Sequence, residues 1–288
     1  MDISPITATQ TIAIAAFCVA LVACIIRLSF RGWRNLTASD YAIGVATFAC
    51  IPELICTIIA IDKGYGKDMS ANPDIFKPLL GAWMSGTIIS SSARISIACS
   101  SLYIITEPPI KWMKPFLWCI IVLQALSVLL VIGFGGTQLN CCFTSTEGCL
   151  DRKNVLVCSY IFTAFCILSD VTCTTATLLI LYKANLRGLM KVAFLAMPTC
   201  IFATFCTILK IYIFTKYDWG TRDTVWVLTI VEEKVILLTA CMSLFPAGKV
   251  LQCLGTRRPA GSQARRYSGR YSQESYVMSI FSGAMERG

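Results

Sequence analysis

Seven ionisable side chains lie inside long apolar runs of this chain, where charge is otherwise rare. Three of them are consecutive in the run TIVEEKVILLTA: Glu232, Glu233 and Lys234. The other four are Glu53, Arg94, Asp170 and Lys210. A charge at the centre of a bilayer costs about 2.5–3.5 kcal/mol even on the lenient insertion scale, so each is a candidate functional residue. Since desolvation favours the neutral form and four carboxyls face three cations, we expect at least one protonated carboxyl.

Carboxyls in apolar surroundings can donate a proton to an apolar substrate or bind a ligand. The candidate catalytic residues are therefore Glu53, Asp170, Glu232 and Glu233. The alternative is that these charges form pairs that only fix helix packing. Neighbouring residues on a helix point about 100° apart. We therefore expect one of the two helix-seven glutamates to face Arg94, and Lys234 to face Asp170 or Glu53.

The residue types that are missing exclude several kinds of chemistry. The chain has no histidine, which removes the commonest general base and metal ligand. No glycine-rich phosphate loop follows a strand pattern, so nucleotide binding has no support. We expect no metal site and no cofactor; a retinal Schiff base would have Lys234 as its only support.

The composition indicates which elements must position these residues. Of 288 residues, 56% are hydrophobic and only 14% are charged, against about 25% charged in soluble domains. Apolar runs of about 20 residues are long enough to cross a bilayer as helices. We predict an all-α polytopic protein of the plasma membrane or endoplasmic reticulum. Its seven transmembrane helices are expected at 11–30, 40–62, 79–106, 116–136, 154–182, 192–214 and 224–246.

The distribution of Lys and Arg predicts the orientation. With the N-terminus outside, fifteen of these residues fall on the cytoplasmic side and seven on the outer side, as the positive-inside rule requires. We expect an extracytoplasmic tail (1–10), a seven-helix domain (11–250) and a basic, disordered cytoplasmic tail (251–288). That tail carries much of the net charge of +9, which indicates anionic lipid as its partner and not nucleic acid.

The outer loop NCCFTSTEGCLDRKN is the one place where cysteine chemistry is expected. It faces an oxidising compartment, in which disulfides persist. A bridge from Cys149 to Cys141 or Cys142 is predicted, and the sequence does not choose between the two. The glycosylation sequon at Asn35 falls in a cytoplasmic loop, so we expect it to be unused.

The order of several short motifs resembles the fungal rhodopsin-like integral membrane family, which includes Pth-type receptor-like proteins and satratoxin-cluster membrane proteins. Asp40-Tyr41 is similar to its DDY, and GYGKD at 64–68 is similar to its GxGxH. SSARISIACSSLY is similar to its third-helix motif, with Arg94 at the Lys position. The loop Cys149, the fifth-helix Asp170 and the acidic seventh helix ending in a proline also match. The likeness covers residues 11–250.

The resemblance implies seven helices and a receptor-like or accessory function, in some members tied to secondary metabolism. Three departures are visible: Asp68 replaces the family's histidine, the proline expected after Asp170 is absent, and Lys210 stands where arginine is usual. A membrane-embedded terpenoid cyclase, free of cofactors, is the alternative. Either function implies a small apolar ligand or substrate, and we expect no enzyme activity if the chain is a receptor.

Overall fold

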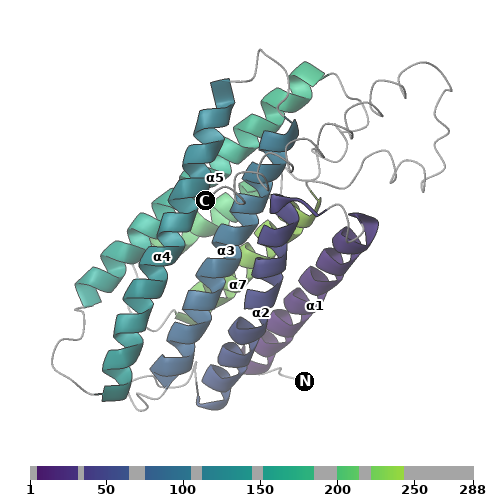
Figure 1. Ribbon diagram of the computed structural model, residues 1–288. Coiled ribbons are helices and arrows are strands. Elements are labelled where there is room, and N and C mark those ends of the chain that lie inside the picture. Colours follow the sequence, from purple (N-terminus) through teal and green to yellow (C-terminus); the bar gives the residue numbers. More distant parts are fainter. Residues whose placement is uncertain are drawn as a thin grey trace, which may run out of the picture. The chain divides into compact units, whose positions relative to one another are not determined.

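The computed structural model contains seven helices and no strand in the part of the chain that it describes, residues 5–31, 36–64, 75–104, 112–144, 152–184, 200–213 and 222–242. At several helix ends, 139–144, 152–156 and 180–184 among them, only the backbone is described. Six helices carry labels in Figure 1: α1 (Pro5–Arg31), α2 (Ala38–Asp62), α3 (Phe76–Ile104), α4 (Lys114–Thr144), α5 (Arg152–Ala184) and α7 (Arg222–Met242). The remaining helix is Cys200–Ile213, here called the 200–213 helix. The expected all-α class is confirmed.

Four of the helices are long and apolar enough to cross a membrane. The qualifying segments are Thr11–Ser29, Ala38–Asp62, Lys114–Gln138 and Val157–Leu179, and the 200–213 helix is a shorter apolar one. This chain is therefore an integral membrane protein. The helices α3 and α7 do not qualify by composition, because α3 is rich in serine and α7 contains three adjacent charges.

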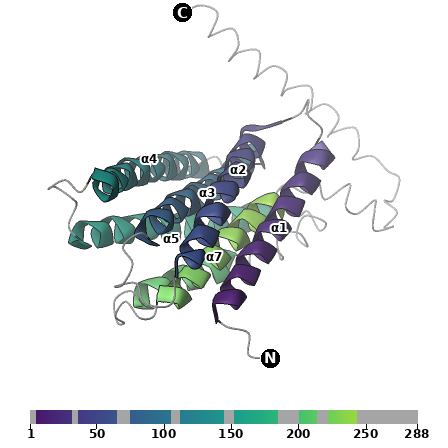
Figure 2. The same ribbon diagram turned by 90° about the horizontal axis from the view of Figure 1, so that it is seen from below.

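The helix α3 occupies the middle of the bundle. It packs against α2, α4, α5 and α7, while α1 packs against α2 and α7. Figure 1 shows α3 between α2 and α4, and the view from below in Figure 2 shows the first and last of these helices, α1 and α7, side by side. Small residues line these contacts: the core includes Ala46, Ala93, Ala98 and Ala240. Small side chains let helix backbones approach closely, which is the usual mode of packing in membranes.

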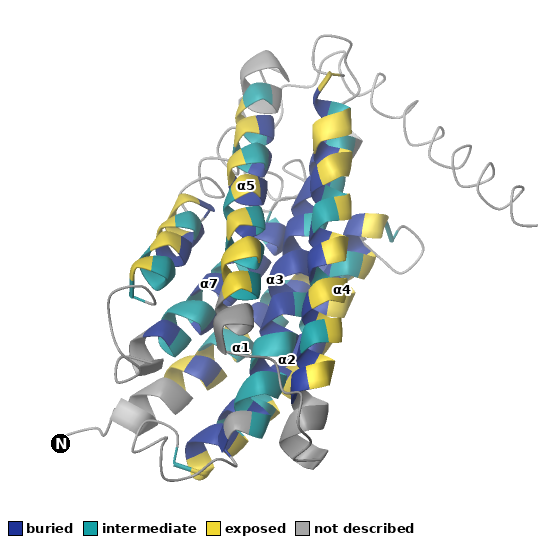
Figure 3. Ribbon diagram, turned by 90° about the vertical axis from the view of Figure 1, so that its left-hand side faces the viewer, coloured by how far each residue is buried: buried dark blue, intermediate teal, exposed yellow. Residues whose placement is uncertain are grey.

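Burial separates the central helices from the peripheral ones. Among the described residues, the exposed large hydrophobic side chains lie on α1, α2, α4 with its leading turn, α5 and the 200–213 helix, and none lies on α3 or α7. In Figure 3, α3 is mostly dark blue, and α4 and α5 show exposed bands along one side. Phe48 of α2, 74% exposed, is the extreme case. An outer belt of this kind is suited to lipid contact, and it explains why α3 and α7 can be polar.

Threonine hydroxyls are satisfied inside their own helices. Thr172 and Thr175 of α5 are on exposed positions, yet each donates to a carbonyl four residues earlier, Leu168 O and Val171 O, both at 2.8 Å. A polar group in the hydrocarbon region has no water to bind, so this local bond keeps it tolerable there.

The helix ends differ most from the expected ones in two places. The first helix begins at Pro5, six residues before the predicted start, and α4 continues to Thr144 instead of ending at 136. Cys141 and Cys142 are consequently in the last turn of α4 and not in a loop. The predicted basic tail, 251–288, lies outside the described residues.

Candidate functional site

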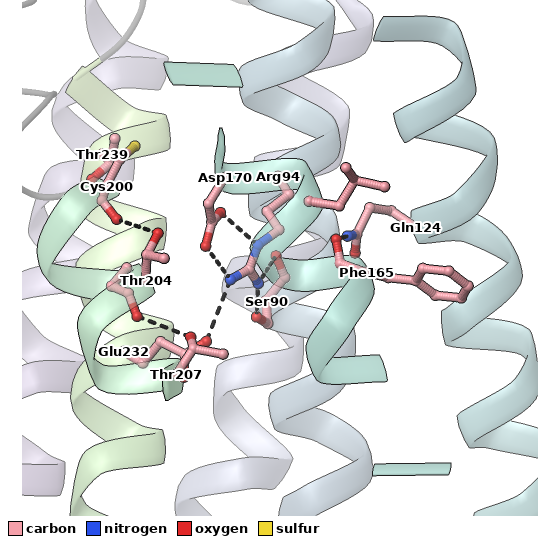
Figure 4. A network of polar contacts seen from close by, with 12 residues as sticks. Ser90, Arg94, Gln124, Phe165, Asp170, Cys200, Thr204, Thr207, Glu232 and Thr239 are labelled. Carbon is pink, nitrogen blue, oxygen red and sulfur yellow. Dashed lines mark hydrogen bonds and ion pairs between the residues drawn. The ribbon is translucent and has the colours of Figure 1, made fainter. Parts of the chain in front are cut away.

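Arg94 is the centre of a buried polar cluster, and its side chain is only 1% exposed. The helix α3 directs it toward α5, where its Nε and Nη2 donate to the two carboxylate oxygens of Asp170 at 2.8 and 2.9 Å. Its Nη1 bonds the hydroxyl of Ser90, one turn earlier, as Figure 4 shows. A forked pair of this kind fixes geometry as well as charge.

The same guanidinium also reaches α7. Arg94 Nη2 is 3.3 Å from Glu232 Oε1. The other oxygen of Glu232 forms an ion pair with Lys210 of the 200–213 helix. The structure thus joins α3, α5, the 200–213 helix and α7 through two cations and two carboxylates, a cluster that is neutral when every member is ionised. We call these four residues the Arg94 cluster.

A second cluster lies between α2 and α7. Lys234 Nζ forms an ion pair with Glu53 Oε2, and Glu233 is the residue that precedes Lys234 on α7. All three residues are at most 5% exposed. Gly86 of α3 makes room for Glu233: a Cβ built there would lie 2.8 Å from the Glu233 Cδ.

The structure therefore answers the question that the sequence left open about helix seven. Glu232 is the glutamate that faces Arg94, and Lys234 turns to Glu53 and not to Asp170. Lys210, expected only within the general network, supplies the second cation for Glu232. The three consecutive charges thus serve two separate clusters, as their angular spacing requires.

A third polar group was not predicted. Arg27 near the end of α1 pairs with Asp40 at 2.9 Å, donates to the hydroxyl of Ser39 at 2.7 Å and bonds the carbonyl of Ala240 on α7. The hydroxyl of Ser39 also contacts Ser96 on α3 at 2.7 Å. The sequence contained a signal for this group, since Arg27 falls inside the first expected span and Asp40 opens the second.

Asp40 has a double role at the start of α2. Its Oδ2 accepts the backbone N–H of Thr37 at 2.9 Å and the Thr37 hydroxyl at 2.8 Å. It thereby caps the helix N-terminus, where a negative charge is favourable. Its other oxygen binds Arg27, so the cap of α2 is tied directly to α1.

Two cysteines meet beside this group. The Sγ atoms of Cys24 on α1 and Cys241 on α7 are 3.4 Å apart, both buried, and Thr47 donates to Cys24 Sγ at 2.9 Å. The predicted disulfide residues are elsewhere: Cys149 and the side chains of Cys141 and Cys142 lie outside the described residues, as does Asn35. Within the described residues no group of three or more acidic, cysteine or histidine side chains could hold a metal.

A narrow crevice runs beside the second cluster. It has room for about one water molecule. Its wall comes from α1, α2 and α7 and comprises Ala13, Phe17, Cys50, Glu53, Leu54, Thr57, Ile230 and Lys234. Of the four candidate catalytic carboxyls, Glu53 is therefore the one that reaches it.

Comparisons with known proteins give no family for this chain: no family model matches it, and no curated protein and no solved structure is similar to it. The resemblance to fungal rhodopsin-like proteins therefore stays a prediction, and the argument for function rests on the clusters themselves.

Proposed function

We propose that this chain is a receptor-like membrane protein of the fungal rhodopsin-like type, associated with a secondary-metabolite pathway. Its helices cross the membrane seven times, with the N-terminus outside and the basic tail in the cytoplasm. The observation that carries the proposal is the Arg94 cluster. Every charged group in that cluster is engaged with another member, and it joins four helices far apart in the sequence.

A closed and charge-balanced cluster of this kind is better suited to holding a conformation than to converting a substrate. Receptors need an element with two arrangements whose balance a ligand can shift. Separating Glu232 from Arg94 would release α7, which ends at Met242, just before the proposed cytoplasmic tail. In this proposal, a change at the Arg94 cluster reaches the tail through α7.

The two helices that are not apolar enough to qualify as spans can still cross a membrane in this proposal. At 1.5 Å per residue, α3 with its 29 residues is about 43 Å long and α7 with its 21 residues is about 31 Å long. The hydrocarbon core is about 30 Å thick. Their polar side chains are covered by the surrounding helices, so low hydropathy does not argue against crossing.

A signalling assay tests this proposal. We would express the full chain, a chain lacking residues 251–288 and the Asp170→Asn variant in one fungal host, and compare the transcript profiles. We expect the full chain to change the profile and the truncated chain, inserted to the same level, to leave it as in cells without the protein. If the truncated chain acts like the full one, the receptor-like function is wrong.

A membrane-embedded cyclase is the second candidate, and the crevice wall favours it. Glu53 is in the wall of the crevice, so a buried carboxyl faces a space beside apolar helices. Asp170 and Glu232 are poorer choices of acid, because each already binds Arg94.

A measurement of substrate turnover distinguishes the cyclase from the receptor. Microsomes containing the protein would be incubated with a prenylated substrate, and products would be examined by mass spectrometry. A cyclase should yield a product isomeric with its substrate and should lose this activity in Glu53→Gln but not in Asp62→Asn, which changes an exposed carboxylate on the same helix. A receptor should give no product in any of the three samples.

A further inference from the structure

We propose that Glu53, Glu233 and Lys234 form an internal proton-binding site, in which the Glu233 carboxyl holds one exchangeable proton beside the ion pair of Glu53 with Lys234. The site lies between α2 and α7 and faces Gly86 of α3. It is distinct from the Arg94 cluster, so it does not depend on the proposed receptor-like function.

The count of charges around the site requires this proton. Its members are one cation and two carboxyls, and all three are buried. Among the described residues that line the crevice or face Glu233, α1 contributes Ala13 and Phe17, α2 contributes the thiol of Cys50, and α3 contributes a glycine. Lys210 of the 200–213 helix is engaged with Glu232. A single proton makes the site neutral, as a low-dielectric interior favours.

The ion pair leads to the same conclusion. Lys234 forms its ion pair with Glu53, which identifies Glu53 as the ionised partner. Glu233 is buried and forms no ion pair within the described part of the chain, so it is the carboxyl that carries the proton.

Gly86 fits this assignment. Its missing side chain allows the end of Glu233 to lie against the backbone of α3, in a buried position. A neutral carboxyl is tolerated in such a position far better than a charged one. The missing side chain of Gly86 and the proton on Glu233 therefore both allow the Glu233 carboxyl to be buried against α3.

The crevice gives the proton a route to exchange. It has room for about one water molecule, and Glu53 and Lys234 are in its wall. At its edge Phe17 and Leu54 are only half-buried, so a water molecule or a small apolar reagent can approach from the side of the bilayer. A water molecule there would have the polar partners that a buried water needs.

Infrared spectroscopy tests the proposal directly, because a protonated carboxyl has a carbonyl band that a carboxylate lacks. We expect the reconstituted protein to show one such carboxyl per chain and Glu233→Gln to lose it. The matched control is Glu232→Gln, which changes the preceding residue in the Arg94 cluster and should keep the band. The proposal is overturned if the band is absent from the wild type or survives in Glu233→Gln.

Two further measurements guard against a variant that does not fold. Dicyclohexylcarbodiimide adds to a protonated carboxyl, and the O-acylisourea rearranges to a stable N-acylurea without any other reagent. In the unmodified protein it should label one carboxyl, in the peptide containing Glu53 or the peptide containing Glu233; labelling confined to other peptides contradicts the proposal. Lys234→Met removes the cation, so both carboxyls should become protonated and the infrared band should double; an unchanged band contradicts the charge count.

Discussion

Replacing Asp170 with asparagine tests the Arg94 cluster most sharply. The two side chains have the same size, so the change removes a charge without leaving a cavity. In the wild type, Asp170 accepts two hydrogen bonds from Arg94, at 2.8 and 2.9 Å. In the variant the cluster keeps both cations but only one carboxylate, Glu232, which must serve Lys210 as well.

The expected loss of stability follows from the burial of the pair. Arg94 is 1% exposed and Asp170 is 4% exposed, so neither can recover its hydration. Removing one partner of a buried pair typically costs about 3–5 kcal/mol, because the other charge is left uncompensated. We expect Asp170→Asn to reach the lower part of this range, since Glu232 still offers Arg94 one contact at 3.3 Å.

Removing both charges should lower the free energy of unfolding by less than the sum of the two single substitutions. In the double variant Arg94→Gln with Asp170→Asn, the remaining pair of Lys210 and Glu232 is neutral. Residues in direct contact commonly show coupling of about 0.5–3 kcal/mol, and a forked buried pair should lie in the upper half of that range. The free energy of unfolding lost in the double variant should therefore be smaller than the sum of the two single losses.

Unfolding of the protein in mixed micelles with increasing dodecyl sulfate, followed by circular dichroism, would measure these free energies. The control is Asp62→Asn, which alters an exposed carboxylate at the end of α2 and should change little. The argument fails if Asp170→Asn costs no more than this control, or if the single losses simply add.

Two other predictions concern contacts of α7 and can be checked with the same preparations. Gly86→Ala should lower the free energy of unfolding by about 1–3 kcal/mol through overpacking, because the new methyl group would displace the Glu233 carboxyl. The control Gly44→Ala, with nothing within 4 Å of the added Cβ, should be neutral or slightly stabilising. Equal effects in the two variants would contradict the packing described for α3 and α7. Oxidation of membranes with iodine, which is reduced to iodide, should link Cys24 to Cys241, whose Sγ atoms are 3.4 Å apart; the linked peptides should be found by mass spectrometry and should disappear when either cysteine is replaced by serine. Failure to link them in the intact protein would show that α1 and α7 do not pack as described.

The sequence alone determined the class of protein and the set of residues to examine. The length of the apolar runs predicted the helices, and each of the seven described helices begins or ends within three residues of an expected boundary. Charged residues inside those runs could be recognised individually, since each is costly in lipid. The helical period also showed that Glu232, Glu233 and Lys234 could not share one partner.

Only the tertiary structure decided which partners those residues have. The period of a helix fixes the angle between its own side chains, but the rotation of each helix about its axis depends on packing against its neighbours. Thus Glu232 meets Arg94, while Glu233 lies against Gly86, a glycine whose importance nothing in its local sequence indicates. The pair of Arg27 and Asp40 likewise joins two helix ends, and a contact between ends depends on how the connecting chain turns. The charged residues and their spacing in the sequence determined which buried charges needed a partner, and helix packing determined which partner each of them has.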